Sequence, residues 1–306
     1  MVKKISLSLA LCTLFVNAIE VEYGTGTFGM EGGFLGLDHR IDCDISTFTI
    51  KNQHSNFGKF YFGFDFTWLD SDRLRQAQKS YNSLAKKGSE YLWSATHSKS
   101  ATIPEIEYRV KGLDINLYLG YDILHKDDKN YLGIGLVTGL SAPVIDADKD
   151  DSVAPDLGFM YSSAGYILDA YKLFSKSKTD FTTYKIGPSI TFQKELIESK
   201  LFLHGTASYA YQNADIDNSF AHMGLSADGR FTSFDIGLTF KPFASKNSSK
   251  YQNLFITAGY NYSRWEVKDV AFDISGAKIS SKILDPLKSN FIMDSQTAYV
   301  GLGLSF

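Results

Sequence analysis

The chain lacks the features that mark several common classes of protein. Its 306 residues contain 2 cysteines, and no segment after the N-terminal stretch reaches the roughly 18 consecutive apolar residues that a membrane-crossing helix needs. Neither sign of charge dominates, because 31 Lys and Arg stand against 34 Asp and Glu. The composition therefore gives no basis for a disulfide framework, a membrane helix or a nucleic-acid-binding surface.

The first 18 residues have the pattern of a secretory signal peptide. Lys3 and Lys4 form the charged start, residues 5–16 the apolar stretch, and Val16-Asn17-Ala18 a small-residue cleavage site. We expect an exported protein with a cleaved leader at 1–18 and one mature domain at 19–306. Without the leader, 29 Lys and Arg face 34 acids, a formal charge of −5, and Cys43 is the remaining cysteine, so no internal disulfide or thiolate centre is expected.

Alternation of apolar and polar residues recurs along the mature chain. Residues 57–69 carry an aromatic residue at every second position from Phe60 to Trp68, a period that only a β-strand produces. The same pattern recurs in segments 113–122, 184–193, 233–241 and 253–263. In these segments Asp, Lys, Asn and Thr occupy the positions between the apolar residues. A soluble core of this size would not be lined by so many polar groups, whereas the lumen of a membrane barrel would be.

The last eight residues, 299–306, alternate in the same way and end on phenylalanine. Behind a secretory leader, they resemble the C-terminal assembly signal of Gram-negative outer-membrane β-barrels, carried here by Val300, Leu302, Leu304 and Phe306. The resemblance implies an all-β fold, a single antiparallel transmembrane β-barrel in the outer membrane. It also implies insertion by the barrel assembly machinery, surroundings of outer-membrane lipid and lipopolysaccharide, and no cofactor. It does not name an activity.

Alternation and turn signals divide the mature chain into ten strands, near 19–30, 44–51, 57–69, 102–123, 130–141, 181–193, 199–213, 229–242, 251–265 and 291–306. Short periplasmic turns at 52–56, 125–129, 194–198 and 244–250 alternate with long extracellular connections near 31–43, 70–101, 142–180, 214–228 and 266–290. Eight or twelve strands remain open, because 102–123 is overlong and slips phase at Lys111-Gly112, and 157–174 fits a strand pair or a helix. One helix is predicted in an outer loop at 71–88, with Ser71 as its cap and Gly88 at its end.

A ten-stranded barrel should be narrow. Six residues are predicted to line its lumen, namely Asp65, Asp114, Lys185, His204, Asp235 and Lys241. Charges of mixed sign at low dielectric tend to pair across such a space. This favours a filled, salt-bridged interior over an ion-selective pore.

The sequence leaves two non-enzymatic functions open, a narrow passive pore for small solutes and a structural or surface-interaction scaffold with surface ligands. The alternative is a rim-active hydrolase, protease-like or lipase-like. Size and strand number resemble those of the omptins, and Asp70, Asp72, Asp215 and Asp217 could supply rim acids. The omptin pattern requires a histidine where Ser219 stands, however, and His222 is off register, so no catalytic residue is assigned.

Two further polar segments have simpler explanations than a site. Residues 52–56 contain a His and a Ser, the residue types that outer-membrane phospholipases use for catalysis. Both lie within one short predicted turn, which is too compact for such a site. The acidic segment that begins at Asp146 carries further aspartates at 148, 150 and 151 and could in principle gather ligands for Ca²⁺. It lacks the Gly and Glu that an EF-hand loop needs at its sixth and twelfth places. We interpret this run as a solvated acidic loop and predict no metal.

Overall fold

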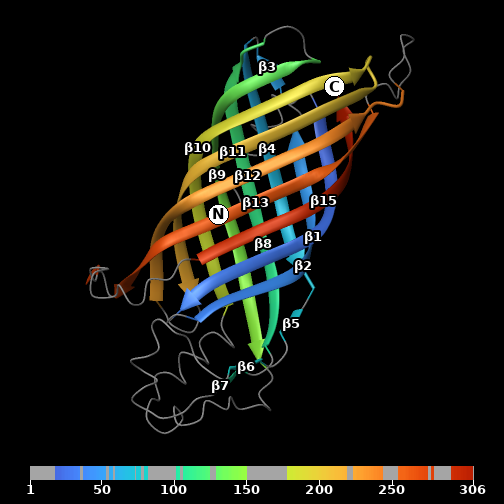
Figure 1. The fold of residues 1–306 in the computed structure, drawn as a ribbon. Coiled ribbons are helices and arrows are strands. Elements are labelled where there is room, and N and C mark those ends of the chain that lie inside the picture. Colours follow the sequence, from blue (N-terminus) through green and yellow to red (C-terminus); the bar gives the residue numbers. More distant parts are fainter. Residues whose placement is uncertain are drawn as a thin grey trace, which may run out of the picture.

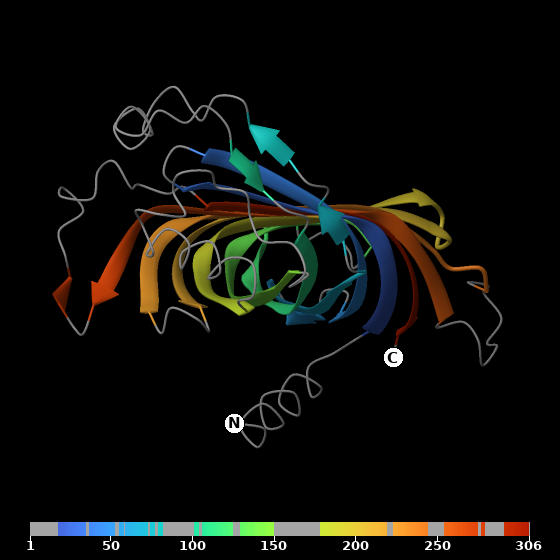
Figure 2. The ribbon, with the colours of Figure 1, turned by 90° about the horizontal axis from the view of Figure 1, so that it is seen from below.

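Ten long strands pair edge to edge into a closed antiparallel barrel in the computed structural model (Figure 1). They are β1 (Ala18–Phe34), β2 (Leu37–Asn52), β4 (Phe60–Ser71), β8 (Ile106–Asp122), β9 (Tyr131–Lys149), β10 (Lys178–Ile197), β11 (Leu201–Asn218), β12 (Met223–Phe240), β13 (Leu254–Ile274) and β15 (Phe291–Ser305). Each pairs with the next along the chain, and β15 pairs back onto β1, so that the ring is closed (Figure 2). The ten strands predicted from the sequence are confirmed.

Short strands extend this ring. The strands β3 (Ser55–Phe57), β5 (Leu74–Gln76) and β14 (Ala277–Lys278) pair with β4, β8 and β13, whereas β6 (Lys79–Tyr81) and β7 (Ala101–Ile103) form a separate two-stranded sheet. The structure describes residues 18–34, 37–52, 55–57, 59–72, 74–76, 79–81, 101–103, 106–124, 129–149, 178–218, 223–243, 254–274, 277–278 and 291–305. No helix in these ranges is long and apolar enough to cross a membrane.

The two ends of the barrel differ. At one end, called the turn end, β1 begins, β15 stops, and short turns join β8 to β9 and β10 to β11. Ser199 takes a positive φ of 57° in the second of these turns, where Lys200 N donates to Ile197 O at 2.9 Å. The opposite end is called the loop end.

At the loop end, the strands continue further than alternation indicated. The ladder of β1 and β2 continues to Phe34 and Leu37, so most of the connection predicted at 31–43 is paired strand. The connections predicted at 214–228 and 266–290 likewise begin as strand, because β11 continues to Asn218 and β13 to Ile274. Backbone pairing needs no apolar face once a ladder has left the lipid, so the sequence pattern stops earlier than the strand.

The suspected phase slip at Lys111-Gly112 leaves the ladder regular. Lys111 pairs with Asp70 and Val144, and Gly112 pairs with Leu69 and Pro143, without a register shift. Segment 157–174, the other source of ambiguity, lies outside the described residues.

The helix predicted at 71–88 is wrong over the residues described there. Ser71 is the last residue of β4, residues 74–76 pair with β8, and residues 79–81 pair with β7. Strand pairing with the projecting end of β8 satisfies the backbone of this segment, and it outweighs a weak helical spacing of apolar residues. Residues 82–88 lie outside the described part of the chain.

Alternate residues of each barrel strand face two different environments. Every one of the ten strands exposes a large apolar residue, among them Val21, Phe48, Phe60, Leu119, Leu136, Ile186, Tyr209, Leu238, Ile256 and Val300. The opposite parity is buried and often polar, as at Asn116, Thr191 and Thr257. This is the inverse of a soluble fold and the arrangement expected of a barrel in lipid.

Candidate functional site: the barrel interior

The interior is divided into layers along the barrel. Its middle is polar and contains a cavity of about 100 Å³, lined from most of the barrel strands. Sites for drug-sized ligands have volumes of about 300–1,000 Å³, whereas a space of this size suits a few water molecules. The cavity is therefore too small for a drug-sized organic ligand.

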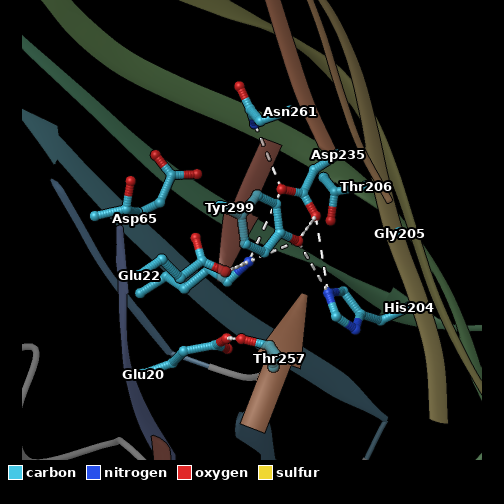
Figure 3. A network of polar contacts seen from close by, with 12 residues as sticks. Glu20, Glu22, Asp65, His204, Gly205, Thr206, Asp235, Thr257, Asn261 and Tyr299 are labelled. Atoms are coloured by element: carbon cyan, nitrogen blue, oxygen red, sulfur yellow. Dashed lines mark hydrogen bonds and ion pairs between the residues drawn. The ribbon is translucent and has the colours of Figure 1, made fainter. Parts of the chain in front are cut away.

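Lys51 of β2 is the centre of one polar cluster, seen from close by in Figure 3. Its Nζ lies 2.5 Å from Glu22 Oε1 and 3.8 Å from Asp235 Oδ2. Tyr299 OH donates to Asp235 Oδ1 at 3.2 Å, and His204 Nε2 lies 3.4 Å from that hydroxyl (Figure 3). These groups come from β1, β2, β11, β12 and β15, so their contacts connect strands that are not all neighbours.

Glu20 lies beside this cluster, and no cation lies within ion-pair distance of it in the part of the chain that the structure describes. It is fully buried, and the hydroxyl of Thr257 donates to its Oε1. Its Oε2 has no hydrogen-bond partner among the described residues. A Cβ at Gly301 would lie 2.5 Å from Thr257 Oγ1 and 2.8 Å from Glu22 Cγ, so glycine is needed between these side chains.

Lys185 of β10 is the centre of a second cluster. Its Nζ lies 2.5 Å from Asp114 Oδ1 and 3.7 Å from the centroid of the Phe231 ring. Asn116 donates to Asp65 Oδ1 at 2.7 Å and to Asp114 Oδ2 at 3.0 Å. A buried ion pair supported by hydrogen bonds and an aromatic ring is the form in which charge is tolerated at low dielectric.

An apolar layer lies on the loop-end side of both clusters. All ten barrel strands contribute to it, and each of its side chains is at most 5% exposed: Phe28, Cys43, Ile45, Leu69, Val110, Val137, Phe181, Ala210, Phe231, Trp265 and Met293. The indole Nε1 of Trp265, the one polar atom of that side chain, donates to Ser141 Oγ at 2.9 Å. Phe181 of β10 stacks on Phe291 of β15 at 5.0 Å between ring centroids, although those strands are not neighbours. The layer therefore spans the cross-section of the barrel.

Aromatic rings form the floor on the turn-end side. Tyr61, Tyr131, Phe202 and Phe255 are all buried. Lys241, directly after β12, lies with its Nζ 5.0 Å from the Phe202 centroid and 5.9 Å from that of Phe255. Burial, and secondarily the neighbouring ammonium of Lys129, lowers the pKa of Lys241.

Comparison with known proteins identifies the fold. No family model and no curated protein matches the chain. Among solved structures, the outer membrane protease OmpT from Escherichia coli matches with a TM-score of 0.50 and 10% identity, over 95% of this chain and 97% of that chain. The outer membrane protein OprG from Pseudomonas aeruginosa matches with a TM-score of 0.36 and 12% identity, over 95% and 96%.

The fold is that of a Gram-negative outer-membrane β-barrel. At these identities the likeness shows the fold alone, so the activity of a neighbour is not carried over to this barrel.

The residues predicted to line the lumen of this barrel fall into separate places. Asp65 and Asp114 line the cavity with the second cluster, and His204 and Asp235 line it with the first. Lys185 is buried against Asp114, while Lys241 lies at the aromatic floor.

Sequence reasoning missed three members of the first cluster, Glu22, Lys51 and Tyr299, and also Glu20 beside it. Parity could have found them, because Glu20 and Glu22 alternate with apolar residues of β1 that face outward.

The rim acids of the hydrolase alternative are not brought together by the described residues. Asp70 is exposed and accepts from Arg109 Nη2 at 3.2 Å. Asp215 is exposed on β11, which is separated from β4 by β8, β9 and β10. Asp72 is exposed after β4, the side chain of Asp217 is outside the described part, and His222 is outside it altogether.

Of the polar segment at 52–56, His54 and the side chains of Ser55 and Asn56 lie outside the described residues. Asn52 Oδ1 accepts from Phe64 N at 2.5 Å and Asn52 Nδ2 donates to Phe62 O at 3.3 Å, a structural role between β2 and β4. The acidic run at 146–151 ends outside the described residues. Where side chains are described, no group of three His, Cys, Asp or Glu could hold a metal ion.

Proposed function

We propose that this protein is a non-enzymatic outer-membrane barrel that acts as a sealed scaffold and presents its loop end to the outside of the cell. Its partners would be ligands at that surface rather than solutes in transit. The apolar layer across the interior carries this proposal. An ion crossing the barrel would have to leave water at that layer, and transfer of a charge into an apolar environment is prohibitively costly.

The proposed location rests on the outward surface. Val300, Leu302 and Leu304 of the predicted assembly signal are 61%, 58% and 50% exposed, and a band of exposed apolar residues passes through every strand. Such a surface suits acyl chains and lipopolysaccharide, after export with a cleaved leader and insertion by the barrel assembly machinery with Phe306 as the last signal residue. The short turns would then lie in the periplasm.

Single-channel recording in planar bilayers tests the sealed state. The wild-type barrel should give no reproducible conductance steps. The double variant Phe231→Ala/Trp265→Ala removes two of the largest buried side chains of the apolar layer and should conduct. The matched control Phe234→Ala, on the lipid-facing parity of β12, should stay silent, and resistance of the folded barrel to denaturation in cold SDS would show that each variant is assembled. Regular channel openings by wild type would refute the proposal.

A further inference from the structure

The side chains around the central cavity carry more negative than positive groups. Lys51 Nζ lies within ion-pair distance of two carboxylates there, and Lys185 Nζ lies within ion-pair distance of a third. His204 also lines the cavity, and even a charged imidazole would leave negative charge in excess. The carboxylates that line the cavity are those of Glu20, Glu22, Asp65, Asp114 and Asp235.

Two of these carboxylates, Asp65 and Glu20, have no ammonium group within ion-pair distance among the described residues, and they differ in their hydrogen bonds. Asp65 accepts from Asn116 at 2.7 Å and from the hydroxyl of Tyr118 at 2.8 Å. Glu20 is fully buried and accepts from the hydroxyl of Thr257 at Oε1, while its Oε2 has no hydrogen-bond partner in the described part of the chain. A buried carboxylate oxygen in this state is costly unless a further group satisfies it. Glu20 is therefore the carboxylate that needs a further partner within the cavity.

Glu20 and Glu22 converge on one small part of the cavity wall. They lie two residues apart on the same face of β1, and Figure 3 shows them together with Thr257. A Cβ placed on Gly301 of β15 would lie 3.0 Å from Glu20 Oε1, 2.8 Å from Glu22 Cγ and 2.5 Å from Thr257 Oγ1. Two carboxylates and a hydroxyl therefore surround the same space, and such oxygen groups are the ligands that hard cations take.

We infer that Glu20, with Glu22 and Thr257, binds a partly hydrated monovalent cation such as sodium inside the cavity. A water molecule could donate to Glu20 Oε2 but would leave the excess negative charge in place. The cavity of about 100 Å³ suits a small ion with a few waters and excludes a drug-sized organic cation. Ca²⁺ takes more oxygen ligands than two carboxylates and one hydroxyl supply.

The ion would be bound rather than conducted, because the apolar layer separates the cavity from the loop end. Such a site goes beyond the proposed scaffold role and does not depend on it. A barrel that conducts would overturn that role and leave the cation site in place.

The test uses the full chain refolded in detergent micelles. Urea titrations would compare sodium chloride with tetramethylammonium chloride at equal ionic strength, so that general screening is the same in both. The unfolding equilibrium constant of the wild type should be about tenfold lower in sodium, once sodium reaches about ten times its dissociation constant. Equilibrium dialysis with radioactive sodium should show saturable binding to the folded barrel.

Glu20→Gln should lose both responses, because it removes the charge that holds the ion. Glu198→Gln is the matched control, since Glu198 is exposed in the turn between β10 and β11, and it should keep both.

The inference would be overturned by equal stability of the wild type in the two salts or by a sodium response retained in Glu20→Gln. It would also be overturned by an infrared band of a protonated carboxyl that disappears in Glu20→Gln, because a proton would then neutralise Glu20. Conductance of the same preparations reports separately on the sealed lumen, so failure of one proposal is distinguishable from failure of the other.

Discussion

At the scale of single residues, buried charge in the interior is unevenly compensated. Lys51 is held by Glu22 and Asp235, whereas Glu20 receives one hydroxyl. Removing one partner of a buried ion pair leaves the other charge unpaired, which costs about 3–5 kcal/mol. Neutral substitutions of Lys51 and of Glu20 should therefore have different effects on stability.

We expect Lys51→Gln to lower the free energy of unfolding by about 3 kcal/mol or more, because it leaves Glu22 and Asp235 without their cation. In tetramethylammonium chloride, Glu20→Gln should be neutral or stabilising, since it removes a buried charge that has no cation within ion-pair distance among the described residues. Urea titration of the refolded barrel, followed by tryptophan fluorescence, measures both. Equal destabilisation by the two substitutions would contradict this assignment of partners.

Cys43 offers a probe of the apolar layer. It is 4% exposed and its Sγ donates to Phe28 O at 3.6 Å, so the thiol is shielded from reagents in water. Maleimide labelling of the folded barrel should therefore be far slower than labelling of the unfolded chain.

The double variant Phe231→Ala/Trp265→Ala supplies the comparison, because loosening the layer should expose the thiol and speed labelling at constant pH. Rapid labelling of the folded wild type would show that the layer is open to water.

At the scale of elements, β2 and β4 share the shortest ladder between neighbouring strands of the barrel. Its ladder runs only from Ile45–Ser71 to Lys51–Asp65, whereas β11 and β12 pair from Leu201–Phe240 to Asn218–Met223. Side chains supplement it, since Thr49 and Thr67 hydroxyls lie 2.9 Å apart and Asn52 bonds to the backbone of β4.

We predict that amide hydrogen exchange is fastest along this junction and that Asn52→Ala raises it most at Phe64. Loss of the bond from Phe64 N should cost about 1–2 kcal/mol locally, because a buried amide loses its acceptor. Exchange measured by NMR in micelles checks this, with β11 and β12 as the internal reference. Protection of the β2–β4 junction equal to that reference would contradict the prediction.

The alternation of apolar and polar residues predicted the strands well wherever one face of the sheet meets lipid, because every second residue must then be apolar. The parity of Asp114 and Lys185 predicted inward positions, but not that these two residues form a pair. Beyond the lipid the pattern stops while pairing continues, so the ladder to Phe34 and the strand at 74–76 could not be read from the sequence.

The apolar layer could not be predicted from the sequence either. Phe28, Phe231 and Trp265 stand on the inner parity of three strands, where each alone is an ordinary departure from a polar pattern. They become a layer only once register aligns the ten strands. A closed ring sets which side chains share a level, and no single segment contains that information.

At the scale of the whole molecule, the barrel is filled from its aromatic floor to its apolar layer, with two clusters of polar groups around a small cavity between them. The filled interior and the closed ring of paired strands would suit the proposed role as a scaffold. Its contacts with partners would then lie at the ends of the barrel.

The most direct test of this account is solute flux through the unmodified barrel. Liposomes reconstituted with the folded protein and diluted into an isosmotic solution of a small sugar should keep their light scattering constant, as protein-free liposomes do. Swelling at a rate that rises with the amount of reconstituted protein would show an open lumen and contradict the sealed scaffold.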